Sequence, residues 1–109
     1  MAYDVTDFQK EVIDASFETP VLIDFWAAWC FPCRMLGPTL EKLAAENEGT
    51  WKLAKVNTDQ NQQTAAQFGI RGIPAVKLMI DGKVVNEFVG ALPEPAIRQW
   101  LAEAIPVTA

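Results

Sequence analysis

Residues 21–33 have the sequence VLIDFWAAWCFPC, and this stretch decides the fold. Its first half, Val21 to Trp26, is almost continuously apolar rather than alternating, which predicts a buried strand. Its second half carries Cys30 and Cys33, the only two cysteines of the chain. A helical pattern follows directly, so the strand delivers a dithiol to the first turn of a helix. That layout is typical of a redox site.

The helix after the cysteines is predicted to run from about Cys33 to Asn47. Pro38 lies inside it and is expected to kink it, because the ring removes a backbone hydrogen bond and crowds the preceding turn. Gly49 is a typical C-terminal stop. One face of this helix is apolar and is expected to be buried: Met35, Leu36, Leu40 and Leu43.

The rest of the chain continues this alternation of helices and strands. A first helix is expected to begin at Thr6, which forms a capping-box pattern with Gln9. Strands are predicted at residues 51–57, 75–80 and 83–89, and further helices at residues 59–68 and 94–105. The pair Asp81-Gly82 between the last two strands is a hairpin signal. This order predicts an α/β fold, a small mixed sheet with helices on both faces.

Composition limits the classes of function. The chain has 109 residues, which suits a single domain over residues 1–109. Fourteen acidic against nine basic residues, with no basic cluster, argue against nucleic-acid binding. No apolar run approaches the ~20 residues of a membrane span, and the N-terminus has no signal-peptide pattern. We expect a cytoplasmic protein, and the acidic single domain suggests a monomer.

The two cysteines are predicted to react one after the other. Cys30 stands at the mouth of the helix, where unpaired N–H groups and the helix dipole stabilise a thiolate, the reactive form. Pro32 suits the first turn, because its missing N–H would be unpaired there anyway. We expect Cys30, exposed at the helix tip, to attack a substrate disulfide. Cys33, nearly one turn further along and beneath it, is expected to resolve the mixed disulfide.

Three other uses of this cysteine pair are open at this point. A structural disulfide would close so short a loop that chain entropy gives only about 2 kcal/mol. A zinc site needs four ligands, and the chain offers two cysteines and no histidine, so no metal is expected. Two inert buried thiols fit poorly with the start of a helix. The preferred interpretation is a redox dithiol.

Several spaced motifs together resemble the thioredoxin family. They are DFWAAWCFPC at residues 24–33, Pro38, IRGIP at residues 70–74 and VGA at residues 89–91. The resemblance covers nearly the whole chain and implies the thioredoxin fold, a central mixed β-sheet flanked by four helices with the dithiol at the start of the second. It also implies a reductase of protein disulfides that needs no cofactor besides its redox-active disulfide and receives electrons from a thioredoxin reductase.

Asp24 is the one charged residue of its strand. A carboxylate inside an apolar run is costly, so burial is expected to raise its pKa toward neutrality. The alternative is that Asp24 faces solvent. The resemblance implies that it lies behind Cys33 and, through water, accepts the proton of that thiol. Lys55 matches the lysine that the family has near this carboxylate.

The resemblance also implies a substrate-binding rim around Cys30. Ile73-Pro74 resembles the family's cis-proline turn, which lies beside the cysteines and pairs its backbone with an extended substrate. A turn is all that the residues alone indicate. The remaining rim is apolar or small, so that a substrate backbone can approach closely: Trp29, Gly72, Gly90 and Ala91, with Pro32 between the cysteines.

Phe31 departs from the family pattern, which most often has glycine here. Its side chain is bulky, apolar and expected to be exposed beside Cys30. It either adds a hydrophobic contact for partners or narrows access to the sulfur. Because Phe31 brings no charge, we expect a reducing dithiol nearer ~−270 mV than the ~−120 mV of strong oxidants.

A second class of function stays open. Residues 65–69 and 93–98 also resemble the N-terminal module of chaperone-like thioredoxin proteins, which carry a helical-repeat tail. Such a module would hold clients rather than mainly reduce them. The sequence ends at residues 106–109, just after the last predicted helix.

Overall fold

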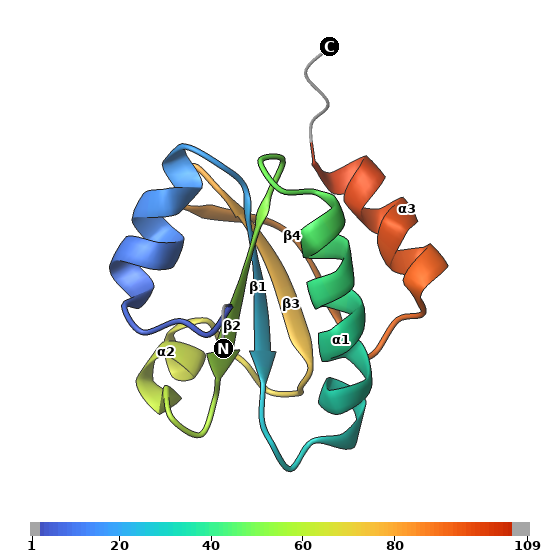
Figure 1. Ribbon diagram of the computed structural model, residues 1–109. Helices are drawn as coiled ribbons and strands as arrows, with labels where there is room; N and C mark the ends of the chain where they lie inside the picture. The colour runs from blue at the N-terminus through green and yellow to red at the C-terminus, as the bar shows by residue number, and fades with distance from the viewer. Residues whose placement is uncertain (1–2, 106–109) are drawn as a thin grey trace.

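Four strands form a mixed sheet in the computed structural model, which describes residues 3–105 (Figure 1). Their order across the sheet is β2 (Lys52–Asn57), β1 (Val21–Trp26), β3 (Ala75–Ile80) and β4 (Lys83–Val89). β1 pairs in parallel with β2 and antiparallel with β3, and β3 pairs antiparallel with β4. The predicted buried strand is therefore an inner strand of the sheet, with neighbours on both sides.

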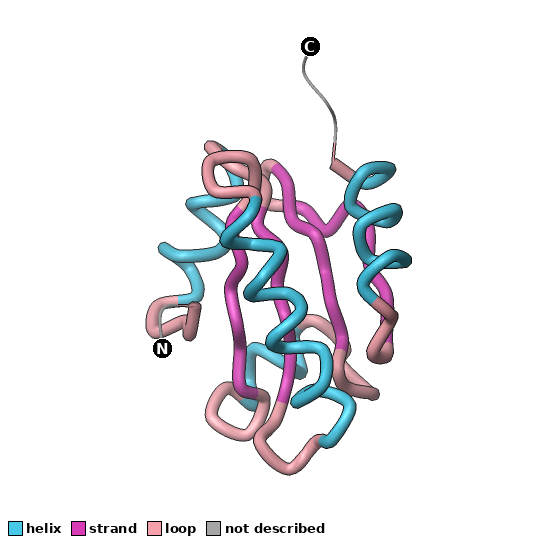
Figure 2. The backbone as a smooth tube through the Cα atoms, turned by 45° about the vertical axis from the view of Figure 1, so that its right-hand side comes forward, coloured by secondary structure: helices cyan, strands magenta, loops and turns pink. Residues whose placement is uncertain are grey.

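Helices cover both faces of the sheet, as predicted (Figures 1 and 2). On one face lie α1 (Phe31–Glu46) and α3 (Glu94–Ala104), packed over a core that includes Leu22, Leu40 and Ile97. On the other face lie a π-helix, η1 (Gln9–Asp14), a 3₁₀ turn, η2 (Ala15–Phe17), and α2 (Gln62–Gln67). The fold is the α/β arrangement expected for a thioredoxin.

The chain before η1 covers the outer edge of β2. The N–H of Val5 donates to the carbonyl of Lys55 over 3.0 Å, and the N–H of Lys55 donates to the carbonyl of Tyr3 over 2.8 Å. These bonds form a parallel bridge between Asp4 and Lys55. The backbone of β2 is thereby paired on both of its sides at Lys55.

Three predicted helix starts differ from the structure, and one of them is that of α2, which begins at Gln62 rather than at residue 59. Thr6 does not cap the first helix through Gln9. Instead the Glu11 carboxylate accepts hydrogen bonds from the N–H and hydroxyl of Thr6, both at 2.9 Å, and from the N–H of Asp7. Helix α1 begins at Phe31 rather than Cys33, because Cys30 is its N-cap and places Pro32 in the first turn.

Met35 was also misplaced, because its side chain is exposed rather than part of the buried face of α1. The face that α1 buries is instead formed by Cys33, Leu36, Gly37, Leu40, Leu43 and Ala44. The face is therefore shifted away from Met35 toward Gly37, where an added Cβ would lie 3.3 Å from the Lys55 ammonium group. The middle of α1 can thus approach the sheet closely.

Candidate active site

The two cysteines meet at the start of α1 and form a disulfide, with their Cα atoms 5.3 Å apart. Cys30 is the N-cap of the helix, and the N–H of Cys33 donates to the Cys30 sulfur over 3.2 Å. The position at the helix tip is as predicted, but the exposure is not. Cys30 is only 4% exposed and Cys33 3%. Ile73, which is distant in sequence, packs against the pair together with the nearby Trp26 and Ala27.

The start of α1 favours negative charge on Cys30. Its sulfur already accepts one backbone hydrogen bond in the disulfide form, and the positive end of the helix dipole points the same way. The first turn holds no acidic residue that would oppose this charge. Reduction would therefore leave Cys30 in a setting that stabilises its thiolate.

The loop before β3 lies directly beside Cys30. The Ile73–Pro74 peptide bond is cis, as the resemblance implied, and the carbonyl oxygen of Ile73 is 3.8 Å from the Cys30 sulfur. The N–H of Gly90 donates to the Pro74 carbonyl over 2.8 Å. The structure thus brings together Cys30, Ile73, Pro74 and Gly90, which are far apart in sequence. Gly90 has a φ of 100°, a conformation that favours glycine.

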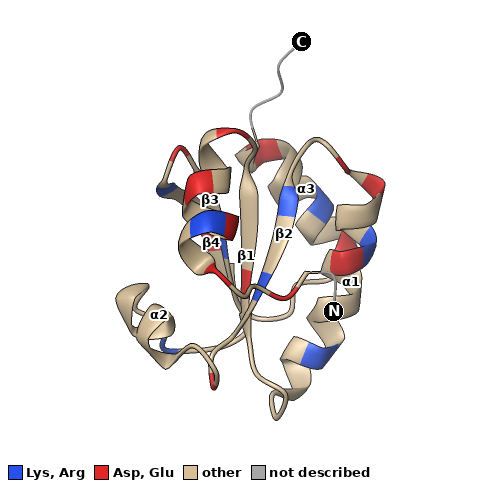
Figure 3. Cartoon of the chain, turned by 60° about the vertical axis from the view of Figure 1, so that its left-hand side comes forward, with Lys and Arg blue, Asp and Glu red and all other residues tan. Residues whose placement is uncertain are grey.

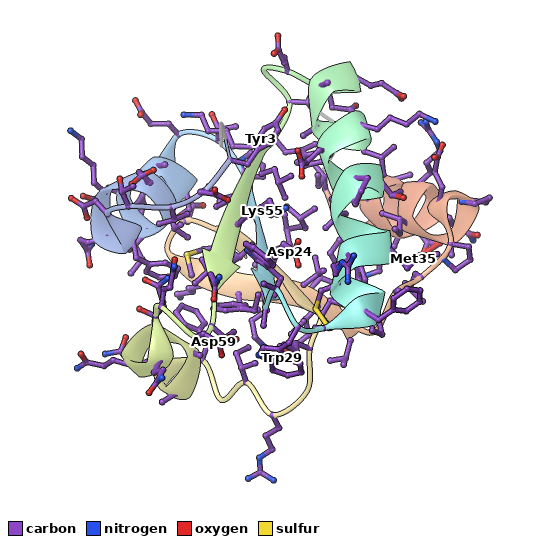
Figure 4. The ribbon with its side chains drawn as sticks, turned by 60° about the horizontal axis from the view of Figure 1, so that its bottom comes forward. Tyr3, Asp24, Trp29, Met35, Lys55 and Asp59 are labelled. Atoms are coloured by element: carbon purple, nitrogen blue, oxygen red, sulfur yellow. A yellow bond between two sulfur atoms is a disulfide. The ribbon has the colours of Figure 1, made fainter. Side chains whose placement is uncertain are left out.

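Exposed aromatic rings flank the disulfide. Trp29 is 70% exposed and Phe31 is 66% exposed. The indole N–H of Trp29 donates to the Asp59 carboxylate over 2.9 Å, which fixes the ring beside the cysteines (Figure 4). Asp59 was not recognised from sequence, since a lone aspartate after a strand indicates only a turn.

A groove of about 400 Å³ lies along α1 and begins at the two residues between the cysteines. Phe31, Pro32 and Met35 form one wall, and Ala91 and Leu92 form the other. Ala91 therefore faces the two residues between the cysteines. Gly72 has an open position, since an added Cβ there would only touch Val89 at an ordinary 3.8 Å.

Asp24 is buried in the middle of β1, so the solvent-facing alternative is wrong. It is 1% exposed, and neither carboxylate oxygen has a hydrogen-bond partner among the described residues. Burial raises the pKa of Asp24 from 3.8 to about 7; Lys55 lowers it and Glu41 raises it. A carboxyl group with this pKa gains and loses a proton in the neutral range.

Lys55 lies next to Asp24 in the sheet but bonds elsewhere. The parallel register of β1 and β2 pairs the two residues (Figure 4). The Lys55 ammonium group is 3.0 Å from a carboxylate oxygen of Glu41 in α1 and 4.9 Å from the centre of the Trp26 ring. Glu41 was not singled out from sequence. The only sequence signal for Glu41 is its position four residues after Gly37, which places the two residues on the same face of the helix.

Charged residues are few but present around the cysteines, since Arg34 follows Cys33 in α1 and Asp59 binds Trp29. In Figure 3 the end of the molecule formed by α2 and the start of α1 is mostly tan, while acidic and basic residues gather on the upper part. The described residues contain no group of three or more potential metal ligands. None of the helices within residues 3–105 is long and apolar enough to cross a membrane.

A family model named Thioredoxin matches residues 1–103. The chain belongs to the thioredoxin family. Thioredoxin 2 of Chlorobaculum tepidum is 48% identical over 105 residues, which cover 94% of each chain. Thioredoxin 1 of Nostoc sp. is 47% identical over 102 residues, with 92% of this chain and 94% of the relative covered. The thioredoxin of Haemophilus influenzae is 44% identical over 99 residues, 91% of each.

Family membership and the paired cysteines together establish the activity class. This thioredoxin-family chain is a thiol-disulfide oxidoreductase that reduces protein disulfides through its Cys30–Cys33 pair. It matches these relatives over nearly their whole length, which favours a plain thioredoxin over a module for holding clients. Residues 106–109, on which the idea of a further tail rested, lie outside the described residues.

Proposed function

We propose that Cys30 is the nucleophile of this reductase and Cys33 the resolving thiol. The Cys30 thiolate attacks one sulfur of a substrate disulfide, forms a mixed disulfide and releases the other substrate sulfur as a thiolate. Cys33 then attacks Cys30, which forms the Cys30–Cys33 disulfide and releases the second substrate sulfur. Two electrons pass from the protein to the substrate. The hydrogen bond from the Cys33 N–H to the Cys30 sulfur is the observation that carries this assignment.

Asp24 is the proton acceptor for Cys33 in this proposal. The thiol must lose its proton before it can attack, and a carboxylate with a pKa of about 7 is matched to that task at neutral pH. The absence of a direct hydrogen bond to either oxygen, among the described residues, leaves the group available for a water that carries the proton. Lys55 tunes this carboxylate by its charge.

Substrates are proposed to bind across the cis-proline loop and the groove beside it. The backbone of Ile73 would pair with an extended substrate strand, while Trp29, Phe31, Pro32 and Ala91 contact its side chains. Gly72 and Gly90 let the substrate backbone approach. A thioredoxin reductase would return the disulfide to the dithiol. A reducing dithiol fits the cytoplasm, where thiols are kept reduced, and we propose a monomer acting there.

Insulin reduction tests the proposed activity. The chain should reduce insulin disulfides when coupled to a thioredoxin reductase or to dithiothreitol, and no reduction with either would contradict the proposal. Replacing Cys33→Ser should trap substrates as stable mixed disulfides on Cys30. The matched variant Cys30→Ser should trap none. If the Cys30→Ser variant traps substrates and Cys33→Ser does not, the two roles are reversed.

A further inference from the structure

Asp24 lacks the ion pair that its neighbour could supply. Lys55 is its register partner on the adjacent strand, yet both Asp24 oxygens have no hydrogen-bond partner among the described residues. The ammonium group of Lys55 is largely buried too, since its side chain is 14% exposed. Two opposite charges that are buried in adjacent strands would ordinarily pair directly, because desolvation makes an unpaired charge costly.

Helix α1 holds the ammonium group instead. The Glu41 carboxylate lies 3.0 Å from Lys55 Nζ. One turn earlier, Gly37 leaves room for the group, since a Cβ at Gly37 would be 3.3 Å from Nζ. The ring of Trp26 lies on a further side, with its centre 4.9 Å from Nζ. Lys55 therefore occupies a defined position beneath α1.

We propose that Glu41 is a positioning residue, which binds the Lys55 ammonium group so that Lys55 does not form an ion pair with Asp24. Asp24 then remains a carboxyl group that can exchange a proton, as the proposed function requires; the inference rests on that role of Asp24. Without Glu41, Lys55 would be free to turn toward Asp24, its register partner on β1. Glu41 would thus act on the cysteines indirectly, through Lys55 and Asp24.

The charges around Asp24 fix the sign of the effect. Lys55 from β2 lowers its pKa, Glu41 from α1 raises it, and the facing residue of β3 is the uncharged Val76. The other ionisable groups of the site are the Cys30 and Cys33 thiols of the reduced protein. Asp4 lies beside Lys55 at the outer edge of β2. Removing Glu41 takes away a like charge and releases an opposite one. Both changes favour the ionised form of Asp24.

The direct test is the titration of the Asp24 side-chain carbon by nuclear magnetic resonance, on the full chain in its disulfide form. In the Glu41→Gln variant the midpoint should move toward acid by about one pH unit. The matched control Glu46→Gln removes the same charge from the same helix, but Glu46 pairs with Arg98 on the exposed side. The control midpoint should stay at the wild-type value. An unchanged midpoint in Glu41→Gln would overturn the inference.

A double-mutant cycle separates positioning from simple charge repulsion. Lys55→Met alone should move the Asp24 midpoint toward alkaline pH. In the Lys55→Met background, Glu41→Gln should produce less than half of the shift that it produces in the wild type. An equal shift in both backgrounds would mean that Glu41 acts only as a like charge, and the inference would be wrong.

Measuring insulin reduction as a function of pH distinguishes the role inferred for Glu41 from the role proposed for Asp24. If Asp24 titrates as expected in Glu41→Gln while the pH profile of reduction stays unchanged, then Glu41 positions Lys55 but Asp24 does not serve Cys33. That result supports the inference and contradicts the proposed role of Asp24. A pH profile that moves with the Asp24 midpoint supports both.

Discussion

Helix α1 carries charged residues on two sides, and the two sides behave differently. On its outer side, Lys42 and Glu46 join Glu94 and Arg98 of α3 in a chain of ion pairs with N–O distances of 2.9 to 3.1 Å. On its inner side, Glu41 pairs with Lys55, and Asp24 lies below without any hydrogen-bond partner among the described residues. The outer cluster is exposed and paired, whereas the inner one is buried and incomplete.

The contrast separates groups whose charged form is stabilised by ion pairs from a group whose charged form is destabilised by burial. Ion pairing lowers the pKa of Glu94 and raises that of Arg98, so these two groups become harder to neutralise. Burial acts in the opposite direction on Asp24, whose charged form is disfavoured at neutral pH. A group that changes charge readily can move protons, and a group that is locked in its charged form cannot.

The strongest test of this contrast is the substitution Asp24→Asn. The folded-state pKa of about 7 exceeds the ordinary 3.8, so the native state binds the extra proton and loses stability as the pH rises from about 4 to 7. The variant carries no such penalty, and at pH 7 it should be more stable by up to about 4 kcal/mol. Urea unfolding at several pH values measures this difference.

The gain should be small near pH 4 and vanish below about pH 3, where the wild-type carboxyl group is protonated in both the folded and the unfolded state. The matched control is Asp14→Asn, at an exposed aspartate of η1. It should leave the pH dependence of stability almost unchanged. A gain for Asp24→Asn that does not depend on pH would mean that charge burial is not its cause.

A second substitution, Phe31→Ala, separates substrate binding from proton transfer at the same end of the molecule. Phe31 is exposed and lines the groove beside the cysteines. Losing its ring should raise the KM for protein substrates about three- to tenfold, because part of its apolar area would be buried in the complex. Steady-state insulin reduction measures this change.

The pH profile of the Phe31→Ala variant should match that of the wild type, since Phe31 carries no charge. Val85→Ala is the control, because Val85 is an exposed apolar residue on β4, away from the groove. A lower KM in Phe31→Ala would instead show that the ring narrows access to Cys30.

The smallest effect is expected on the outer side of α1. Replacing Arg98→Gln removes two ion pairs, with Glu46 and with Glu94, but all three groups are exposed to water to a substantial degree. The Tm should fall by less than about 3 °C, and the difference should shrink further in high salt. Thermal unfolding at low and high salt measures it. A large fall in Tm that does not depend on salt would contradict the proposed difference between the two sides of α1.

Local pattern was sufficient for the central strand and for the site that it carries. The apolar run from Val21 to Trp26 predicts β1 because an inner strand must be apolar on both faces. Asp24 is conspicuous for the same reason. The position of Cys30 at a helix start followed from the strand before it and the helical pattern after it. The cis state of Pro74 came from the family resemblance, because the residues themselves indicate only a turn.

Features that depend on distant contacts were not predicted from sequence. Cys30 is buried because Ile73, more than forty residues later, packs against it. Glu41 pairs with Lys55 because of where α1 crosses β2, which no local pattern encodes. Thr6 is not the cap because its hydroxyl donates to Glu11, while the Asp7 carboxylate accepts a hydrogen bond from the N–H of Lys10. Tertiary packing decides the first two cases, whereas the third is a local competition between side chains five residues apart.

The pairing of β2 on both of its sides has a practical consequence for Lys55. Its N–H and carbonyl are bound by Tyr3 and Val5, while the opposite side of β2 pairs with β1. The amide of Lys55 should therefore exchange its hydrogen with solvent slowly, although β2 is the outermost strand on its side of the sheet. Shortening the chain to begin after Val5 would expose this amide and loosen the lysine that neighbours Asp24. The first few residues would then influence chemistry at cysteines that lie far along the chain.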